Sequence, residues 1–142
     1  VFITSCGYSP LYSVKNNNVN FEIGKINITG DRDLNQNIIN QLKNLKTKKE
    51  SNSIKYNLTI DTQIKKIITS KDSKGNPITY KMISTVTLTT IKEGKEYNLT
   101  VESVENYNDI SSKFELETFE RNLKINSASK ITQEIIVYLI TL

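Results

Sequence analysis

The sequence has no histidine and no tryptophan, and its 142 residues include one cysteine and two prolines. Histidine is the usual neutral-pH base, the usual activator of a serine or cysteine nucleophile and a frequent zinc ligand, so its absence removes most chemistry of these kinds. One cysteine can form neither an internal disulfide nor a paired-cysteine metal site. We therefore expect no catalytic residue, no metal site and no cofactor, and we expect packing alone to stabilise the fold.

Long runs of one charge and long apolar runs are missing as well. The net charge is +4, but the Lys and Arg residues are dispersed, so we expect no nucleic acid among the partners. No segment approaches the roughly 20 apolar residues of a membrane-spanning helix. The one dense acidic group, Glu115, Glu117 and Glu120, is spread around the expected helix instead of converging on one point. A carboxylate enzyme is therefore the weakest of the functions considered, and we expect that the protein is not an enzyme.

The single cysteine, Cys6, ends the stretch Ile3-Thr4-Ser5-Cys6. An aliphatic residue followed by two small residues and a cysteine fits the lipobox of bacterial lipoproteins, and residues 1–3 look like the end of the apolar segment of a signal peptide. The alternative is an unmodified cysteine in an N-terminal strand, which Gly7 and Pro10 disfavour. We expect Cys6 to be the site of lipidation.

The lipobox also predicts how the chain is organised. We expect residues 1–5 to be a signal-peptide remnant, residues 6–20 a lipidated N-terminus with a polar tether, and residues 21–142 one domain. Each buried methylene of an acyl chain contributes about 0.8 kcal/mol, so two or three chains, such as palmitate, hold a protein firmly on a membrane. The lipid is then the expected membrane attachment.

Two periodicities predict the secondary structure. Apolar residues alternate over residues 21–29, 54–64, 78–88 and 97–104, which is typical of half-buried strands, with a phase shift at Gly24-Lys25 that indicates a bulge and another before Val104. Helical spacing follows the candidate N-caps Asp31 and Asp33, and returns from about Ser111 to the C-terminus, with an irregularity expected at Asn126-Ser127. We expect an α+β two-layer sandwich of order β-α-β-β-β-α, its four-stranded sheet covered on one face by two helices.

The alternation also predicts which side chains point away from the helices. This outer face is dominated by threonine and asparagine: Asn57, Thr59, Asp61, Gln63 and Lys65, then Thr79, Lys81, Thr85, Thr87 and Thr89, then Asn98, Thr100 and Glu102. One interpretation is a solvated sheet face, because threonine is a good strand former. The other is a surface suited to a hydrated partner, such as the polar lumen of an outer-membrane barrel. The residue spacing does not decide between them.

Lysines gather at one end of the expected hairpin. The turn over residues 71–77 contains Lys71 and Lys74, and Lys65, Lys66 and Lys81 lie in the strands beside it. Such a cluster would attract a phosphate-bearing ligand, although each lysine taken singly is also typical of a solvated turn.

The tract Cys6-Gly7-Tyr8-Ser9-Pro10-Leu11-Tyr12 follows the lipobox directly. It resembles the mature N-terminus of the LptE family of lipopolysaccharide-assembly lipoproteins, written C-G-[FY]-x-P-L-Y. The rest of the chain is similar to that family in the order and length of its elements, without a sharp motif. By analogy with lipoprotein sorting, Gly7 after the cysteine favours the outer membrane.

The resemblance implies a protein anchored at the periplasmic face of the outer membrane, acting as a plug in the β-barrel LptD and assisting it in placing lipopolysaccharide at the cell surface. It also implies lipopolysaccharide binding by basic residues of the sheet and loops. Lys71, Lys74 and Lys81 are nominated for that role by charge and position. The alternative function is an envelope lipoprotein facing the periplasm, which acts as a scaffold or adaptor and binds no glycolipid.

Overall fold

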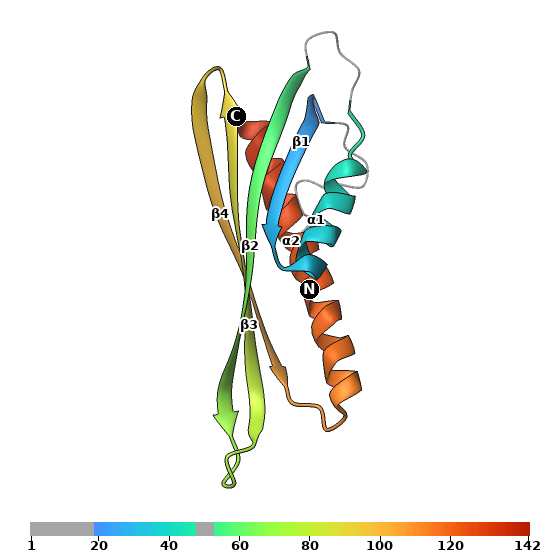
Figure 1. Ribbon diagram of the computed structural model, residues 1–142, viewed down its shortest axis with the longest axis vertical. Coiled ribbons are helices and arrows are strands. Elements are labelled where there is room, and N and C mark those ends of the chain that lie inside the picture. The colour runs from blue at the N-terminus through green and yellow to red at the C-terminus, as the bar shows by residue number, and fades with distance from the viewer. Residues whose placement is uncertain (1–18, 48–52) are drawn as a thin grey trace, which may run out of the picture.

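Figure 1 shows a computed structural model of the chain, which describes residues 19–47 and 53–142. Cys6, the tract after it and residues 6–18 of the proposed tether lie outside the described residues. The last two residues of that tether are described, and Val19 differs from the prediction, because it is buried in the core and forms a parallel β-bridge with Thr47. The elements in chain order are β1 (Phe21–Gly30), α1 (Arg32–Lys43), β2 (Ile54–Lys71), β3 (Pro77–Lys92), β4 (Lys95–Asn108) and α2 (Lys113–Thr141).

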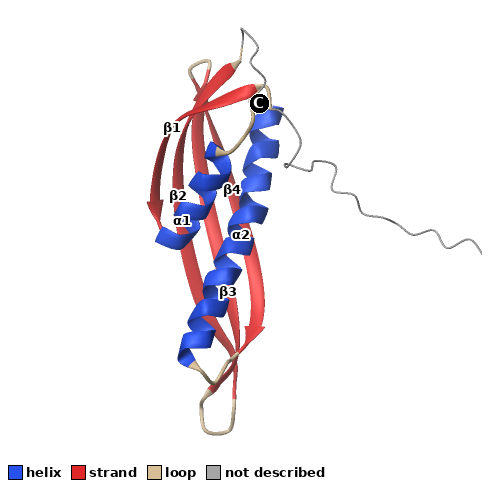
Figure 2. Ribbon diagram, turned by 90° about the vertical axis from the view of Figure 1, so that its right-hand side faces the viewer, coloured by secondary structure: helices blue, strands red, loops and turns tan. Residues whose placement is uncertain are grey.

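The strands form one sheet in the order β1-β2-β3-β4, with β1 parallel to β2 and the other pairs antiparallel. Both helices lie on the same side of the sheet, α2 along most of its length and α1 beside the upper half of α2 (Figure 2). The expected α+β sandwich is confirmed. The expected bulge is also present, because the pairing of β1 with β2 shifts between Ile23 and Ile26.

The core lies between the sheet and the two helices. On β2, Tyr56, Leu58 and Ile60 alternate with exposed residues and are almost fully buried. Each such side chain contributes about 1.5–3 kcal/mol relative to an exposed one. They pack in one cluster with buried residues of both helices, namely Leu34, Ile38 and Leu42 of α1 and Ile131, Ile135 and Leu139 of α2.

Two local predictions about the C-terminal half are wrong. No phase change occurs before Val104, which points outward and is 44% exposed, because the inward position is occupied by Ser103. The Ser103 hydroxyl donates to Ser127 Oγ at 3.3 Å, so small polar side chains let α2 approach the sheet here. The helix also continues without interruption through Asn126 and Ser127.

The strands of the sheet differ in length, and this determines which strand edge has no neighbouring strand among the described residues. β1 pairs only with the first part of β2, from Ile54 to Thr62, while β2 continues to Lys71. The second half of β2 and the first half of β3 form a long hairpin that extends past the start of α2, at the lower end of Figure 1. We call residues 63–85 the distal hairpin. Ile78, which we expected to point inward, is 45% exposed because it lies near the tip of this hairpin.

Candidate functional site

The outer face of the distal hairpin combines cations with apolar side chains. The cross-strand pairing sets Lys65 opposite Ile83 and Ile83 opposite Val104, and it sets Ile67 opposite Lys81. Because successive residues of a strand alternate between faces, all five side chains are on the side away from the helices. We call these five residues the basic–apolar patch. Here three aliphatic residues cluster and interrupt the polar pattern of the outer face, whereas Ile91 near the other end of β3 is a single exposed one.

The tip of the hairpin holds two of the nominated lysines. Lys71 ends β2 opposite Pro77, and Lys74 lies exposed in the turn. Asp72 fixes this turn, since its Oδ1 accepts the backbone N–H groups of Lys74 at 2.9 Å and Asn76 at 2.8 Å. These contacts, with those from Asn76 the largest, lower the pKa of Asp72 below its usual value. The turn therefore presents ammonium groups on an ordered loop.

The third nominated lysine, Lys81, lies farther along the hairpin. Four residues of strand, about 13 Å, separate it from Pro77 at the tip. Lys71, Lys74 and Lys81 thus follow one another along a strip and do not converge on a point. Lys65 lies diagonally across from Lys81 on the same face of the hairpin. Its position makes it a cation of the site as much as Lys81 is.

Lys66 points the other way, toward α2, although its sequence position placed it with the other cations. Its Nζ lies 2.6 Å from Glu120 Oε1 and 4.2 Å from the centre of the Tyr80 ring. The ammonium group is therefore already paired inside the protein. Lys66 anchors the hairpin to the helix and leaves anion binding to the lysines of the outer face and the tip.

An aromatic cluster on the inner side supports the patch from behind. The Tyr80 and Tyr107 rings are stacked with their centres 5.3 Å apart, and the Phe119 ring lies 5.8 Å from that of Tyr107. The Tyr107 hydroxyl donates to Glu120 Oε1 at 2.8 Å. Burial first, and the Glu120 carboxylate second, raise the pKa of Tyr107 well above its usual value. The hairpin is thus held rigidly against the first turns of α2.

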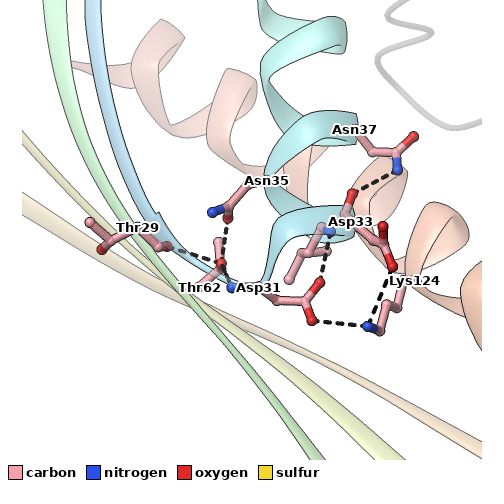
Figure 3. A network of polar contacts seen from close by, with 8 residues as sticks. Thr29, Asp31, Asp33, Asn35, Asn37, Thr62 and Lys124 are labelled. Atoms are coloured by element: carbon pink, nitrogen blue, oxygen red, sulfur yellow. Dashed lines mark hydrogen bonds and ion pairs between the residues drawn. The ribbon is translucent and has the colours of Figure 1, made fainter.

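The end of β1 is fixed by the polar network of Figure 3. Thr62 Oγ1 accepts the backbone N–H of Asp31 at 3.0 Å and donates to the carbonyl of Thr29 at 3.1 Å. Gly30 between them has a φ of 108°, a conformation that only glycine adopts readily. Here the chain leaves the sheet and enters the helix layer as α1, so the distal part of β2 has no neighbour on that side within the described residues.

Asp31 then begins α1. Its Oδ1 accepts the N–H of Leu34 at 2.9 Å, as an N-cap does, and its Oδ2 lies 2.9 Å from Lys124 Nζ of α2. Burial raises the pKa of Asp31, but the Leu34 N–H and the Lys124 ammonium together outweigh it, so the net pKa is lowered. Of the two candidate caps, Asp31 is the one used, while Asp33 lies 3.7 Å from the same ammonium group.

The rest of the outer face has the polar character that the alternation predicts. Thr59, Thr89 and Asn98 form one row across the sheet, and Asp61, Thr87 and Thr100 form the next. The Thr89 hydroxyl donates to Asn98 Oδ1 at 2.7 Å. The face therefore combines a centre of mostly uncharged polar side chains, some of them hydrogen-bonded to each other, with the basic–apolar patch at its distal end.

The apolar residues of the basic–apolar patch were not predicted from the sequence as part of a site. Ile67 and Ile83 occupy outward positions in strands whose other outward residues are mostly polar, and that break in the pattern was the available signal. Val104 was assigned to the wrong face. A search for hydrophobic residues in the polar phase of a strand would have found all three.

None of the helices in the described ranges is long and apolar enough to cross a membrane. No family model matches the chain, and neither does a curated protein sequence.

Several solved structures are similar in fold, among them the following two. One is rare lipoprotein B from Shewanella oneidensis, at 18% identity over 83% of this chain and 98% of that one, with a TM-score of 0.59. The other is an uncharacterized lipoprotein B from Nitrosomonas europaea, at 11% identity over 87% of this chain and 89% of that one, with a TM-score of 0.56. At these identities the likeness shows a shared fold, that of two bacterial proteins described as lipoproteins.

Proposed function

We propose that this protein is a lipoprotein of the outer membrane, anchored at the periplasmic face by acyl groups on Cys6, that plugs an LptD-like β-barrel and binds lipopolysaccharide at the distal hairpin. It assists the barrel in assembling lipopolysaccharide at the cell surface and carries out no covalent chemistry. The observation that carries the proposal is the basic–apolar patch, continued by Lys71 and Lys74 at the tip.

The chemistry of the patch matches that of an anionic glycolipid. Lipopolysaccharide carries phosphate groups next to acyl chains, and lysine binds phosphate as a point charge. Within the described residues, Lys65 and Lys81 take part in no ion pair, so their ammonium groups are free to do so. Ile67 and Ile83 lie beside both lysines, and Val104 lies next to Ile83 on β4, so the three offer apolar contact to the first methylenes of an acyl chain.

The remainder of the outer face supports the barrel part of the proposal. The lumen of an outer-membrane barrel is polar and hydrated. Rows of threonine and asparagine side chains, such as Thr59, Thr89 and Asn98, can exchange hydrogen bonds with such a wall or with bridging water, without burying a charge. The fold shared with proteins described as lipoproteins and the lipobox at Cys6 support the membrane anchor.

A titration with lipopolysaccharide tests the ligand. We expect saturable binding that weakens with salt, because the contacts are ionic. Replacing Lys65, Lys71, Lys74 and Lys81 together by Gln should raise the apparent Kd about tenfold or more. A matched variant with Gln at Lys25, Lys43, Lys55 and Lys95 loses the same charge elsewhere and should bind like the parent protein. Equal weakening by both variants would show that the binding is non-specific.

Membrane attachment and the barrel partner are tested separately. Mass spectrometry of the protein from membranes should find acylated Cys6 as the first residue, and Cys6→Ala should be released from the membrane. A large barrel protein should co-purify through detergent. Acylated protein that purifies without a barrel and binds no lipopolysaccharide would instead support the adaptor function.

A further inference from the structure

Among residues 19–47 and 53–142, the sheet has three stretches of free edge, and they are not equally protected. Along β1 the bulge between Ile23 and Ile26 disrupts the edge, and bulges of this kind discourage pairing with another strand. Along β4 the helix α2 reaches over the edge. The Tyr138 hydroxyl donates to the carbonyl of Asn98 at 3.1 Å, and Lys130 forms an ion pair with Glu105 at 2.5 Å.

The third stretch is Gln63–Ile68 of β2, just past the end of β1. Its pairing with β3 is regular from Gln63 opposite Thr85 to Ile68 opposite Tyr80, and the register slips only beyond Ile68. In an antiparallel pair every second residue directs both its N–H and its C=O away from the partner strand. Six residues of regular strand, about 20 Å long, therefore present backbone donors and acceptors to the open side.

We propose that Gln63–Ile68 accepts an extended acidic segment of a partner protein as an additional strand of the sheet. Backbone pairing of this kind gives affinity, and side-chain contacts on alternate positions give specificity. The proposal concerns a protein contact at the strand edge and does not depend on lipopolysaccharide binding at the outer face.

The side chains along the edge define the partner. The stretch carries Lys65 on the outer face and Lys66 on the inner face, and no acidic residue. Ile67 points outward next to Lys65, and Ile68 points inward with 44% of its surface exposed. A strand that alternates acidic and aliphatic residues would place its acidic side chains beside Lys65 on the outer face and its aliphatic side chains beside Ile68 on the inner face, where Lys66 is already paired with Glu120. Opposite charges on neighbouring strands are favourable.

A second copy of this chain fits the same edge poorly. Two identical edges would bring their lysines together, and lysine on an edge strand is a recognised means of preventing self-association. The other long edge of a second copy, that of β4, is covered at Asn98 by Tyr138. An acidic segment from a different protein would face neither the repulsion between lysines nor a covered edge.

The test uses nuclear magnetic resonance of the full chain with a synthetic peptide of about ten residues in which glutamate and valine alternate. We expect saturable shift changes centred on Gln63–Ile68. We also expect amide hydrogen exchange about tenfold slower at alternate residues of that stretch, because each protected amide gains a hydrogen bond. Lys65→Glu should weaken binding about fivefold or more. Lys55→Glu is the control. Lys55 lies on the same strand and face, but at a place where β1 already pairs with β2, so this change should leave peptide binding unchanged.

Several outcomes would overturn the proposal. These are no saturable change at Gln63–Ile68, protection along β4 instead, and equal binding of a peptide with lysine in place of glutamate or with proline at its centre. Concentration-dependent protection of the same amides without peptide would identify a second copy as the occupant. Alternate-residue protection produced by lipopolysaccharide micelles alone would identify the edge as part of the glycolipid site.

Discussion

Lys124 of α2 joins Asp31, the N-cap of α1, through an ion pair of 2.9 Å between Nζ and Oδ2. The two residues are 93 positions apart in the chain, and about four-fifths of each side chain is buried, with 19% and 21% exposed. The same carboxylate accepts the Leu34 N–H through its other oxygen. One side chain thus starts a helix, pairs it with the second helix and fixes the point where β1 ends.

Removing this carboxylate should destabilise the fold measurably. Asp31→Ala should lower the free energy of unfolding by about 2 kcal/mol, because the helix loses its cap and Lys124 is left partly buried without its nearest partner. Asp33→Ala is the matched control, since Asp33 is 3.7 Å from Lys124 and 47% exposed, and it should cost about 0.5 kcal/mol or less. Urea unfolding followed by circular dichroism measures both. Equal costs would contradict the assignment of the cap.

The lowered pKa of Asp31 predicts a pH dependence of stability. A carboxylate whose pKa is lower when folded contributes stability above its unfolded pKa, about 3.9, and loses it as the pH falls through the folded value. The advantage of the parent protein over Asp31→Asn should therefore be constant near neutral pH and shrink below about pH 4. Unfolding curves across this range provide the measurement. Parallel stability profiles for the two proteins would show that Asp31 is not responsible.

Gly30 should be intolerant of any side chain. It combines a φ of 108° with a backbone so close to Thr62 that a Cβ would overlap the Thr62 carbonyl. Gly30→Ala should cost about 4 kcal/mol or prevent folding. Gly75→Ala in the hairpin turn is the control, because its φ is 85° but a Cβ there meets nothing within 4 Å, so only the backbone cost of about 1–2 kcal/mol applies. A well-folded Gly30→Ala protein would refute the close approach.

The bond from the Tyr107 hydroxyl to Glu120 should make a measurable contribution to holding the distal hairpin against α2. Tyr107→Phe keeps the ring stack and removes only this bond, so we expect a loss of about 1–2 kcal/mol, in the range of a hydrogen bond to a charged group. Tyr97→Phe, near the other end of β4, should change stability by about 0.5 kcal/mol or less. Faster amide exchange across Tyr80–Thr85 in the first variant would locate the effect.

Sequence alone predicted the parts of the fold that follow a strict local period. The alternation of Tyr56, Leu58 and Ile60 placed β2 in the core correctly, and Asp31 was among the two expected caps. The prediction of which β4 side chains point inward was wrong at Val104, because Ser103 occupies the inward position. A small polar residue there has no hydrophobic signal, and its place depends on Ser127 from a helix far along the chain.

The candidate site was only partly predictable, for a similar reason. Charge and turn chemistry indicated the lysine-rich end of the hairpin, but the sequence could not separate Lys66, which pairs with Glu120, from Lys65, which faces out. That distinction depends on strand phase and on the register with α2. The open edge of β2 was also not predicted, because the strand expected over residues 54–64 continues to Lys71, past the end of β1 at Gly30.

The most direct test of the proposed function is photo-crosslinking at the patch in cells of a bacterium that produces lipopolysaccharide. A benzophenone amino acid replaces Ile83 in the centre of the patch or, as the control, Thr87 four residues along on the same face of the same strand. We predict a lipopolysaccharide adduct, identified by mass, at position 83 and little or none at position 87. No adduct at position 83, or equal adducts at both positions, would contradict the account.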